Sequence, residues 1–540
     1  MTTLRSDTPL LEGTVKSVVE LWVACLKEAG HQYHVRTERD ELYARHRVEE
    51  EGIAFLTITL PAFEKDFVEA LSQGGVASNH FAGFRRRGGL PTFLSGFLRL
   101  IFDNAGSLRP DANPLTVKAV RQVLLFSSKI ELPTLERREK GAIKAFVETD
   151  REVGEHEIPS SLLEEFSVWS HALYGRFFGR VEARLYNGDW LPRHSSGALA
   201  TRESYNSRFA FRVWTERLQE VFPWWEDMGI GYSDAHDLGE PSILPPEQET
   251  PVRVSCVPKT MKGPRIIAME PSWMQFVQQG ILAVMVDEIT QPYNAHLERR
   301  MGWLDQDPNR ELARRGSIDG SFATLDLSEA SDRVSLQLVE ALLGRNRFLR
   351  RCVLAARSTT AQLPDGQVIH LNKFASMGSA LCFPIESLVF QVLCVMAIAK
   401  TRGTRASMRP FGLRNFPENR VYGDDLIVPQ TAAQTLVGLL EAFGLKVNTR
   451  KSFTTGLFRE SCGADWFKGV DVGVFRQKHP LPDHGHQHGL LDTGIQLHNR
   501  VYDAGWYQLA SVIENSLYRV RSFIPKAPPG TPAAALWAWG

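Results

Sequence analysis

Apolar and polar positions follow two clear periods along this chain. Between residues 161 and 185, apolar side chains recur at every third or fourth position, which predicts an amphipathic helix. Ser161 and Glu164 match a capping box at its start. The most apolar stretch, residues 381–399, is interrupted by one proline and two polar side chains, so we expect a buried core helix and no membrane span.

Two short β-type patterns stand out further along. Residues 322–325 form an apolar run that ends at Asp326, and a helical pattern follows at 336–343. In residues 420–429, two apolar runs flank a Gly-Asp centre, which predicts a hairpin with Asp424 and Asp425 at its tip. Between these patterns, a flexible Ser/Gly loop at residues 375–379 leads into the apolar helix and permits close backbone approach to a ligand.

The composition is that of a folded chain. Of the 540 residues, 43% are apolar and 23% are charged, which argues against disorder. Lysine plus arginine and aspartate plus glutamate each number 62, so the net charge is zero and a wholly basic nucleic-acid binder is excluded. A basic channel confined to one part of the protein is not excluded by this balance. The polar start of the sequence contains no apolar signal core, so we expect a soluble, intracellular protein.

The carboxylates are the strongest candidates for chemistry. Adjacent aspartates repel each other unless a cation lies between them, and hard oxygen ligands suit Mg²⁺ or Mn²⁺. A polar hairpin turn is the alternative for Asp424 and Asp425. Asp326, at the end of a strand, would complete a two-metal site beside that hairpin. For Asp332 the alternative is a helix N-cap.

The order of these segments carries a resemblance. A carboxylate strand, a Ser/Gly loop with a helix, and Tyr-Gly-Asp-Asp at 422–425 are similar to motifs A, B and C of a template-dependent polymerase palm, and that hairpin resembles the hallmark of viral RNA-directed RNA polymerases. Residues 257–271 resemble the basic fingers motif of those enzymes. The run at 456–472 is closely similar to the replicase β subunits of positive-strand RNA bacteriophages, the leviviruses, and residues 316–321 and 445–453 also match that family.

This resemblance, which covers residues 253–475, implies an α+β fold. The implied fold is the right-hand polymerase fold of fingers, palm and thumb, with an antiparallel palm sheet backed by helices. The N-terminal region and fingers would occupy residues 1–310. The palm, with motifs A to E, would occupy 311–470, and the thumb and C-terminal tail 471–540.

The resemblance also implies an activity and its residues. The chain would be an RNA-directed RNA polymerase that replicates a single-stranded RNA phage genome from ribonucleoside triphosphates by two-metal nucleotidyl transfer. The catalytic and metal-binding residues would be Asp326, Asp424 and Asp425, with two Mg²⁺ ions and Mn²⁺ as a substitute. The nucleotide would be bound by Lys259, Lys262, Arg265, Asp332, Ser376 and Gly378. Either Lys446 or Lys451 would act as a general acid for pyrophosphate.

Four positions depart from the expected pattern. Ser379 and Cys382 stand where the family usually has asparagine and threonine, and Ser331 and Glu386 stand where many RNA polymerases have aspartate and asparagine. The pattern therefore does not identify the residues that recognise the ribose hydroxyl, and Asp332 is the candidate. Two alternatives remain: a reverse transcriptase-like polymerase, and a catalytically inactive polymerase-derived RNA-binding protein.

The expected partners are the RNA template and product, with ribonucleoside triphosphates as substrates. The resemblance adds host elongation factors Tu and Ts and a host ribosomal protein, in the cytoplasm of a bacterial host. Three arginine-rich segments are candidates for holding RNA, at 193–212, 345–357 and 402–414. The histidines between His484 and His488 favour an exposed loop over a metal site.

Overall fold

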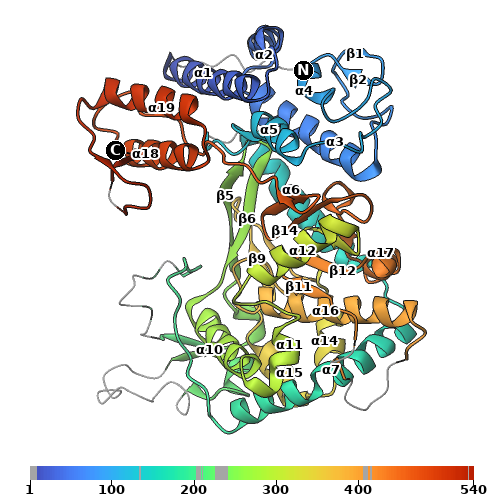
Figure 1. Ribbon diagram of the computed structural model, residues 1–540. Helices are drawn as coiled ribbons and strands as arrows, with labels where there is room; N and C mark the ends of the chain where they lie inside the picture. Colours follow the sequence, from blue (N-terminus) through green and yellow to red (C-terminus); the bar gives the residue numbers. More distant parts are fainter. Residues whose placement is uncertain are drawn as a thin grey trace.

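The structure is a computed structural model that describes residues 9–132, 136–201, 203, 208, 211–224, 241–405, 412–413, 416–532 and 534–539. It combines helices with short, mostly antiparallel strands, arranged as an upper and a lower body (Figure 1). The predicted α+β class is therefore confirmed. Five candidate RNA-contacting residues lie outside the described residues: Arg202, Tyr205, Phe209, Arg409 and Arg414.

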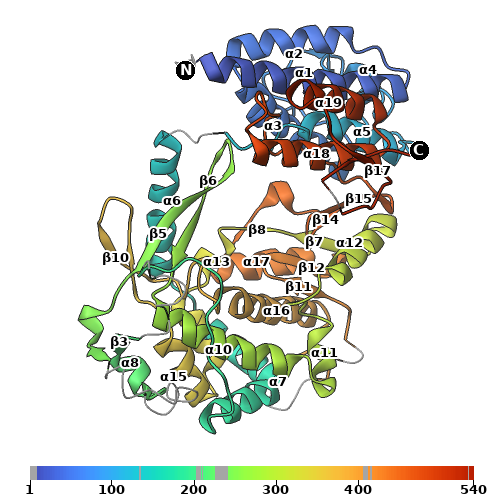
Figure 2. The same cartoon turned by 90° about the vertical axis from the view of Figure 1, so that its left-hand side faces the viewer.

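Both ends of the chain build the upper body (Figure 2). Its helices are α1 (Pro9–Gln32), α2 (Glu38–Glu51), α3 (Leu60–Gln73), α4 (Ser95–Leu98), α5 (Pro114–Leu125), α18 (His488–Asp503) and α19 (Tyr507–Val520). Trp22, Phe67, Leu509 and Leu517 belong to one buried hydrophobic cluster. Because both termini share this core, the first 130 residues and the last 50 fold as one unit. The predicted domain boundaries at 310 and 470 stay predictions.

Smaller elements complete the upper body. They are the π-helical turn η1 (Phe55–Thr59), and the strands β1 (Arg86–Arg87), β2 (Leu90–Pro91), β17 (Lys526–Ala527) and β18 (Leu536–Trp537). The Trp22 indole nitrogen donates a hydrogen bond of 2.8 Å to the Val123 carbonyl, which joins α1 to α5.

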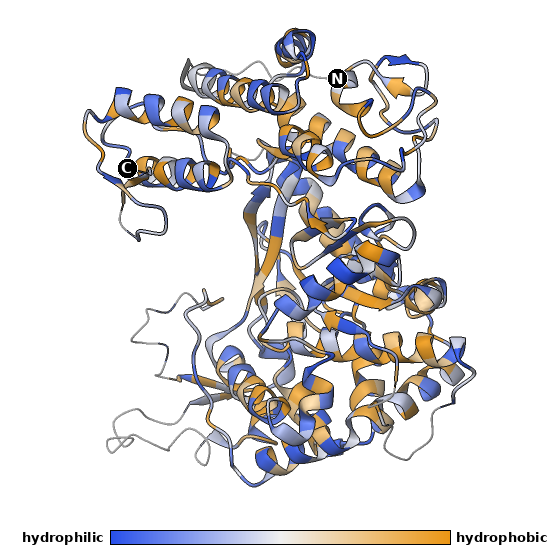
Figure 3. Ribbon diagram, viewed as in Figure 1, coloured by the Kyte–Doolittle hydropathy of each residue, from blue (hydrophilic) through white to orange (hydrophobic). Residues whose placement is uncertain are grey.

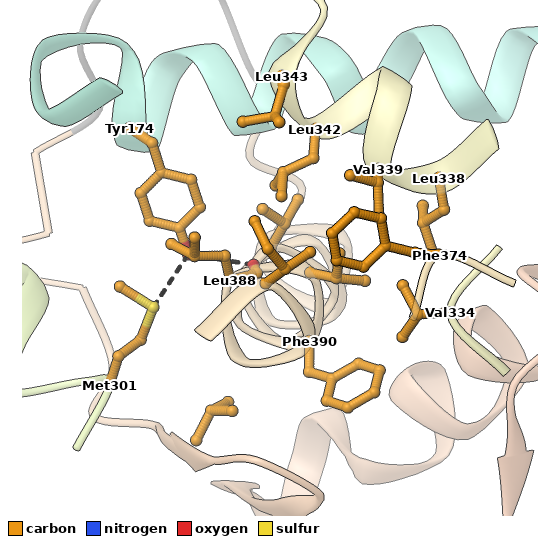
Figure 4. Close-up of a cluster of buried hydrophobic side chains, with 14 of the residues drawn as sticks. Tyr174, Met301, Val334, Leu338, Val339, Leu342, Leu343, Phe374, Leu388 and Phe390 are labelled. Atoms are coloured by element: carbon orange, nitrogen blue, oxygen red, sulfur yellow. Dashed lines mark hydrogen bonds between the residues drawn. The ribbon is translucent and has the colours of Figure 1, made fainter. Parts of the chain in front are cut away.

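The lower body is built around one buried helix, α16 (Cys382–Thr401). The helices around it are α7 (Ser160–Tyr186), α10 (Ser272–Ile289), α11 (Ala295–Glu298), α13 (Ala330–Arg333), α14 (Leu336–Leu343), α15 (Arg347–Ala355) and α17 (Ala433–Ala442). Leu388 and Phe390 of α16 lie among side chains of α14 and Phe374, and the Tyr174 hydroxyl of α7 donates to the Leu388 carbonyl at 3.3 Å (Figure 4).

Among the described residues, α16 is the one helix long and apolar enough to cross a membrane, and 94% of its apolar window is buried inside the protein. Its hydrophobic residues stand out in Figure 3. The prediction of a core helix is therefore confirmed. The helix predicted over 161–185 is also confirmed as α7, but it begins at Ser160 with Pro159 as N-cap, and no side-chain capping bond forms. The predicted capping box is wrong because Ser161 already lies inside the helix.

A three-stranded antiparallel sheet places the predicted aspartates together. Its order is β11 (Arg420–Tyr422), β12 (Asp425–Pro429), β7 (Phe322–Leu325). Tyr422 pairs with Asp425, and Leu426 pairs with Leu325. The end of β7 therefore lies beside the β11–β12 turn. Just beyond Asp326, β8 (Leu327–Ser328) pairs with β13 (Lys446–Val447).

A long hairpin rises from the lower body toward the upper body (Figure 2). It consists of β5 (Val252–Thr260) and β6 (Gly263–Met269), and its sheet has the order β10-β9-β5-β6, with β9 at Thr360–Gln362 and β10 at Val368–His370. Helix α6 (Glu136–Glu155) packs against β6. This hairpin carries the predicted basic residues Lys259, Lys262 and Arg265.

A second hairpin ties the lower body to the upper one. It consists of β14 (Phe458–Ser461) and β15 (Ala464–Phe467), and β16 (Val470–Asp471) adds a third strand beside β15. The hairpin packs against α12 (Asp307–Asp319). Arg121 of α5 reaches it: its guanidinium lies 2.8 Å from a Glu64 oxygen and 3.0 Å from an Asp465 oxygen. All three side chains are at most 10% exposed, so this is a buried ionic connection.

A buried carboxyl at the base of β6 makes the stability of the fold depend on pH. Glu270 accepts a hydrogen bond of 2.5 Å from the Ser358 hydroxyl, and burial raises the pKa of Glu270 from 4.5 to about 7. Below pH 4.5 the Glu270 carboxyl is neutral in both the folded and the unfolded chain, and the stability that its neutral form contributes to the fold is fully present. This stability is lost as pH rises through 7, because burial disfavours the ionised Glu270 carboxylate in the folded chain, whereas the same group ionises readily in the unfolded chain.

We expect Glu270→Gln to remove this dependence. The free energy of unfolding of the parent should fall by roughly 3 kcal/mol relative to the variant between about pH 4.5 and 7. Urea denaturation across that range measures the difference. The exposed Glu136→Gln is the control, and its free energy of unfolding relative to the parent should not rise with pH. The prediction would be contradicted if the free energies of unfolding of Glu270→Gln and the parent changed in parallel with pH.

Candidate active site

A cavity of about 700 Å³ opens where the ends of β7 and β11, the strand β6 and the start of α16 meet. Asp326 and Asp424 both line it. Lys259, Arg265 and Lys451 line the same cavity. The structure thus gathers two predicted carboxylates and three cations that are distant from one another in the sequence.

Asp326 is held in place from the segment after β13. The Asn448 amide donates a hydrogen bond of 2.8 Å to its carboxylate, and the Ser452 hydroxyl accepts one from its backbone amide at 3.1 Å. Burial raises the pKa of Asp326, the charge of Lys451 opposes that rise, and the charge of Asp424 adds to it. The carboxylate is therefore fixed in position and held close to another negative charge.

Gly423 explains how Asp424 reaches the cavity. Its φ of +57° lies in the left-handed region, and a Cβ there would come within 2.9 Å of the Phe383 ring and 3.2 Å of a Glu386 oxygen. Glycine is the residue that fits both restrictions. The predicted hairpin is confirmed, with Gly423 and Asp424 as its two turn residues. Asp424 is exposed at the tip.

Asp425 is directed away from this cavity. Its carboxylate accepts hydrogen bonds from the Cys462 amide at 3.1 Å and the Ser461 hydroxyl at 3.3 Å, both next to the β14–β15 turn. Burial, followed by the charges of Asp424 and Asp326, raises the pKa of Asp425 to about 6. Asp425 is thus a half-buried carboxylate whose pKa is raised by the other two aspartates, although it does not line their cavity.

The donor set suits a divalent cation. In the described part of the chain, no three His, Cys, Asp or Glu side chains are gathered as preformed metal ligands. However, the repulsion between Asp326 and Asp424 and the raised pKa values of Asp326 and Asp425 are what a bound cation would relieve. Carboxylate oxygens are the ligands that Mg²⁺ and Mn²⁺ prefer. The residues present therefore fit such an ion.

The two candidate general acids occupy different places. Lys451 lines the cavity, and its ammonium nitrogen lies 3.9 Å from Asp326 and 4.0 Å from Glu460. Burial opposes its charge, but the carboxylates of Glu460 and Asp326 outweigh that effect and raise the pKa of Lys451. Lys446 is exposed on β13 and does not line the cavity. Of the two, only Lys451 is in reach of the candidate carboxylates.

Asp332 also lines the cavity. Its carboxylate accepts a hydrogen bond of 3.0 Å from the Lys373 ammonium, which is 0% exposed and stacks on the Phe146 ring at 3.4 Å. Asp332 does not cap a helix; it lies inside the short helix α13. The N-cap alternative for this residue is therefore wrong.

The Ser/Gly loop approaches β6 closely. Gly378 lines the cavity, and at its φ of +134° a Cβ would come within 2.0 Å of the Ala268 carbonyl, so only glycine permits this approach. The Ala268 amide donates to the Met377 carbonyl at 2.9 Å. Ser376 does not line this cavity; it is buried at 6% exposure in a smaller one beside Glu270, because the loop turns it inward.

Glu386 is a further acid of this cavity. It is 8% exposed on α16, one of its carboxyl oxygens has no hydrogen-bond partner, and it lines the cavity beside Gly423. Burial raises the pKa of Glu386 well above its usual range, and Asp424 and Asp332 add to the rise. It is one of the positions where the sequence departs from the expected motif, and the structure places it within the candidate site.

A second cavity, of about 310 Å³, adjoins the first. Both are lined by Lys259 and Lys451. Its further basic residues are Lys65, Arg121, Lys129, Lys262, Arg450 and Arg476. It is also lined by Glu460 and by Glu64 and Asp465, which are paired with Arg121. Burial lowers the pKa of Lys65 and of Lys262, and so do neighbouring cations: Arg450 and Lys451 for Lys65, and Lys65 and Arg450 for Lys262. Cations that repel one another in a confined space indicate a site for a polyanion.

Sequence reasoning missed Lys65 and Lys129. Lys65 lies on α3 and Lys129 lies just after α5, so both belong to the upper body. No local motif marks either lysine, and their cationic neighbours are hundreds of residues away in the sequence. Their position gives residues 1–150 a place at the candidate site.

The structure also bears on two further predictions, the RNA-holding role of Arg357 and the exposed loop of the histidine cluster. Arg357 was a candidate for holding RNA, but it is 7% exposed and donates to the carbonyls of Leu371, Lys373 and Phe374, so it is structural. His484 and His486 are exposed, and their rings stack with centroids 5.7 Å apart. The prediction that these histidines lie in an exposed loop is confirmed.

Comparison with known proteins decides the family. The sequence model of the family described as RNA replicase, beta-chain, matches residues 247–529, which is more than half of the chain. The chain belongs to the RNA replicase β-chain family. The matched region contains β5, β6, the three-stranded sheet and α16, and so includes the candidate site.

Several relatives come from RNA phages. The chain is 37% identical over 235 residues to the RNA-directed RNA polymerase subunit beta of Enterobacteria phage SP, which covers 44% of this chain and 37% of the relative. It is 37% identical over 225 residues to that of Escherichia virus Qbeta, covering 42% and 35%. It is 32% identical over 272 residues to the beta chain of Escherichia phage MS2, covering 49% and 43%. The matched parts thus span less than half the length of these relatives.

Among solved structures, the RNA-dependent RNA polymerase of a human picorbirnavirus is similar at 12% identity and a TM-score of 0.35, covering 50% of this chain and 55% of that one.

Proposed function

We propose that this replicase-family chain is an RNA-directed RNA polymerase that copies single-stranded phage RNA from ribonucleoside triphosphates. The observation that supports this most directly is the shared cavity of Asp326 and Asp424, lined on its other walls by Lys259, Arg265 and Lys451. A cavity with two carboxylates and three cations suits a metal-bound triphosphate. In this proposal the right-hand arrangement places the palm around the β11-β12-β7 sheet, with fingers and thumb on either side.

Asp326, Asp424 and Asp425 are the proposed ligands of two Mg²⁺ ions, with Mn²⁺ as a substitute. Bound there, the ions would lower the pKa of the primer 3′-hydroxyl and balance the charge of the leaving pyrophosphate. To hold such an ion, Asp425 would give up its hydrogen bonds with the Cys462 amide and the Ser461 hydroxyl.

The chain's own side chains position the nucleotide. Lys259 and Arg265 on the rising hairpin hold the triphosphate, and Lys262 lies further out in the adjoining cavity. Lys451, kept protonated by Asp326 and Glu460, gives a proton to pyrophosphate as it leaves. Asp332, oriented by Lys373, accepts a hydrogen bond from a ribose hydroxyl, and Gly378 lets the loop approach the sugar.

Primer extension on an RNA template tests the activity directly. Incorporation of ribonucleotides and not deoxyribonucleotides is the expected result. A preference for deoxyribonucleotides would identify a reverse transcriptase, and RNA binding without synthesis would identify an inactive RNA-binding descendant. The expected partners are RNA and nucleotides, together with host elongation factors Tu and Ts and a host ribosomal protein, in the bacterial cytoplasm. Co-purification from infected cells tests the host factors.

The upper-body lysines make a separate prediction about substrate entry. Replacing Lys65 and Lys129 together by alanine should raise the KM for ribonucleoside triphosphates by roughly three- to tenfold and change kcat little, because each lysine attracts a polyanion before the chemical step. Steady-state extension kinetics measure both constants. The exposed Lys16→Ala on α1 is the matched control and should leave KM unchanged. An unchanged KM in the double variant would contradict a role in entry.

A further inference from the structure

A further cavity of the lower body lies away from the candidate active site. It has a volume of about 1110 Å³ and is lined by α7, by the turn η5 (Pro292–Asn294) with α11, and by the segment that precedes β11. None of its lining residues lines the catalytic cavity. Asn419 borders it at one end of β11, and Asp424 follows the other end, roughly 16 Å further along an extended chain.

The wall of this cavity is strongly basic. Arg176, Arg180, Arg299, Arg300 and two histidines line it. Among the described residues that line it, Glu418 is the one acid, and it is already paired with Arg315 at 2.8 Å. The cavity therefore carries excess positive charge.

Of the four arginines, Arg300 is structural, Arg180 contacts Glu288 and Tyr293, and Arg176 and Arg299 are available to a ligand. Arg300 donates to the carbonyls of Leu413 and Phe416 at 2.9 and 3.0 Å, so it shapes the wall. The side chains of Arg176 and Arg299 are exposed, and the described residues give neither of them a hydrogen bond or an ion pair. Exposed cations without partners at a cavity can contact phosphate without breaking any existing interaction.

An exposed aromatic ring lies beside these cations. Tyr293 is 48% exposed, and the Arg180 guanidinium stacks over its ring at 3.9 Å. The same guanidinium lies 3.8 Å from Glu288, which is 4% exposed and fixes Arg180 from below. An aromatic ring interleaved with cations is the arrangement that holds single-stranded nucleic acid, because bases stack on the ring while cations contact the backbone.

We propose that this cavity binds a segment of single-stranded RNA outside the catalytic cavity. The inference rests on the proposed function, since it takes RNA as the substrate. Arg176 and Arg299 contact phosphates, and a base stacks on Tyr293. A long template is thereby held at a second place while its paired part occupies the catalytic cavity.

The double variant Arg176→Gln/Arg299→Gln of the full chain tests the proposal. Its affinity for a long unstructured RNA should fall about tenfold at moderate salt, and the plot of log affinity against log salt should become less steep by about 1.4, because two phosphate contacts are lost. Extension of a short self-priming hairpin, which is too short to reach the cavity, should match the parent. The exposed pair Arg519→Gln/Arg521→Gln on and just after α19 is the control and should change neither quantity.

A second variant separates stacking from charge. Tyr293→Ala should weaken binding of the long RNA without changing its salt slope, and Tyr293→Phe should restore binding. The proposal is overturned if affinity and slope match the parent in the arginine variant. It is also overturned if that variant loses binding of labelled ATP alone, since the ligand would then be a free nucleotide. Failure of the parent to extend the hairpin would instead count against the proposed polymerase activity.

Discussion

Asp424→Asn should lower RNA synthesis by roughly a thousandfold or more while RNA binding stays near that of the parent. Asparagine keeps the size of the side chain at the hairpin tip and removes its negative charge. Because Asp424 lines the cavity and is exposed, the change removes a proposed metal ligand without disturbing a buried contact. Primer extension and equilibrium RNA binding, measured on the same preparations, give the two quantities.

Asp365→Asn is the matched control for this variant. Asp365 is also an exposed aspartate in the turn of a hairpin, between β9 and β10, where it accepts a hydrogen bond of 3.0 Å from the Gln367 amide. We expect it to synthesise RNA at the parent rate. If Asp424→Asn retained synthesis, its assignment as a metal ligand would be wrong, whereas equal loss in both variants would indicate general damage to folding.

Local patterns predicted the elements that carry the candidate site. The β11–β12 hairpin follows from two apolar runs around Gly-Asp, and α7 and α16 follow from their apolar periodicity. In each case the information lies within about 25 consecutive residues, the scale on which turn chemistry and helical period act. The placement of Asp326 beside Asp424 was inferred from motif order, and the pairing of Leu325 with Leu426 explains it physically.

Side-chain direction and long-range contacts were harder to predict. Asp424 is a residue of the hairpin turn and Asp425 is the first residue of β12, so their side chains have different surroundings, and the Asp425 carboxylate accepts a hydrogen bond from the Cys462 amide. Ser376 turns inward because its loop packs on β6. Lys65 faces Arg450 only through the packing of two bodies, for which the local sequence around either residue gives no signal.

Arg121→Met should be the most destabilising single change proposed for this fold, at about 3–5 kcal/mol of unfolding free energy. The guanidinium of Arg121 lies between Glu64 and Asp465 and donates to the Val472 carbonyl at 2.7 Å. Methionine fills much of the same space but leaves the two buried carboxylates without their ion-pair partner. Because Arg121 belongs to the upper body and Asp465 to the hairpin below it, the loss should appear as early separation of these two parts. Urea denaturation, followed by hydrogen exchange in α5 and β15, measures both the cost and its location.

Two comparisons make this prediction specific to burial. Arg109→Met breaks the ion pair with Asp111, whose side chains are 43% and 70% exposed, and should cost far less than Arg121→Met because water screens that pair. Adding Glu64→Gln and Asp465→Asn to Arg121→Met should recover part of the lost stability, since the buried charges are then gone. If Arg121→Met cost no more than Arg109→Met, the triad would not hold the two bodies together. If the triple variant were less stable than Arg121→Met alone, the cost would come from lost packing and not from unpaired charge.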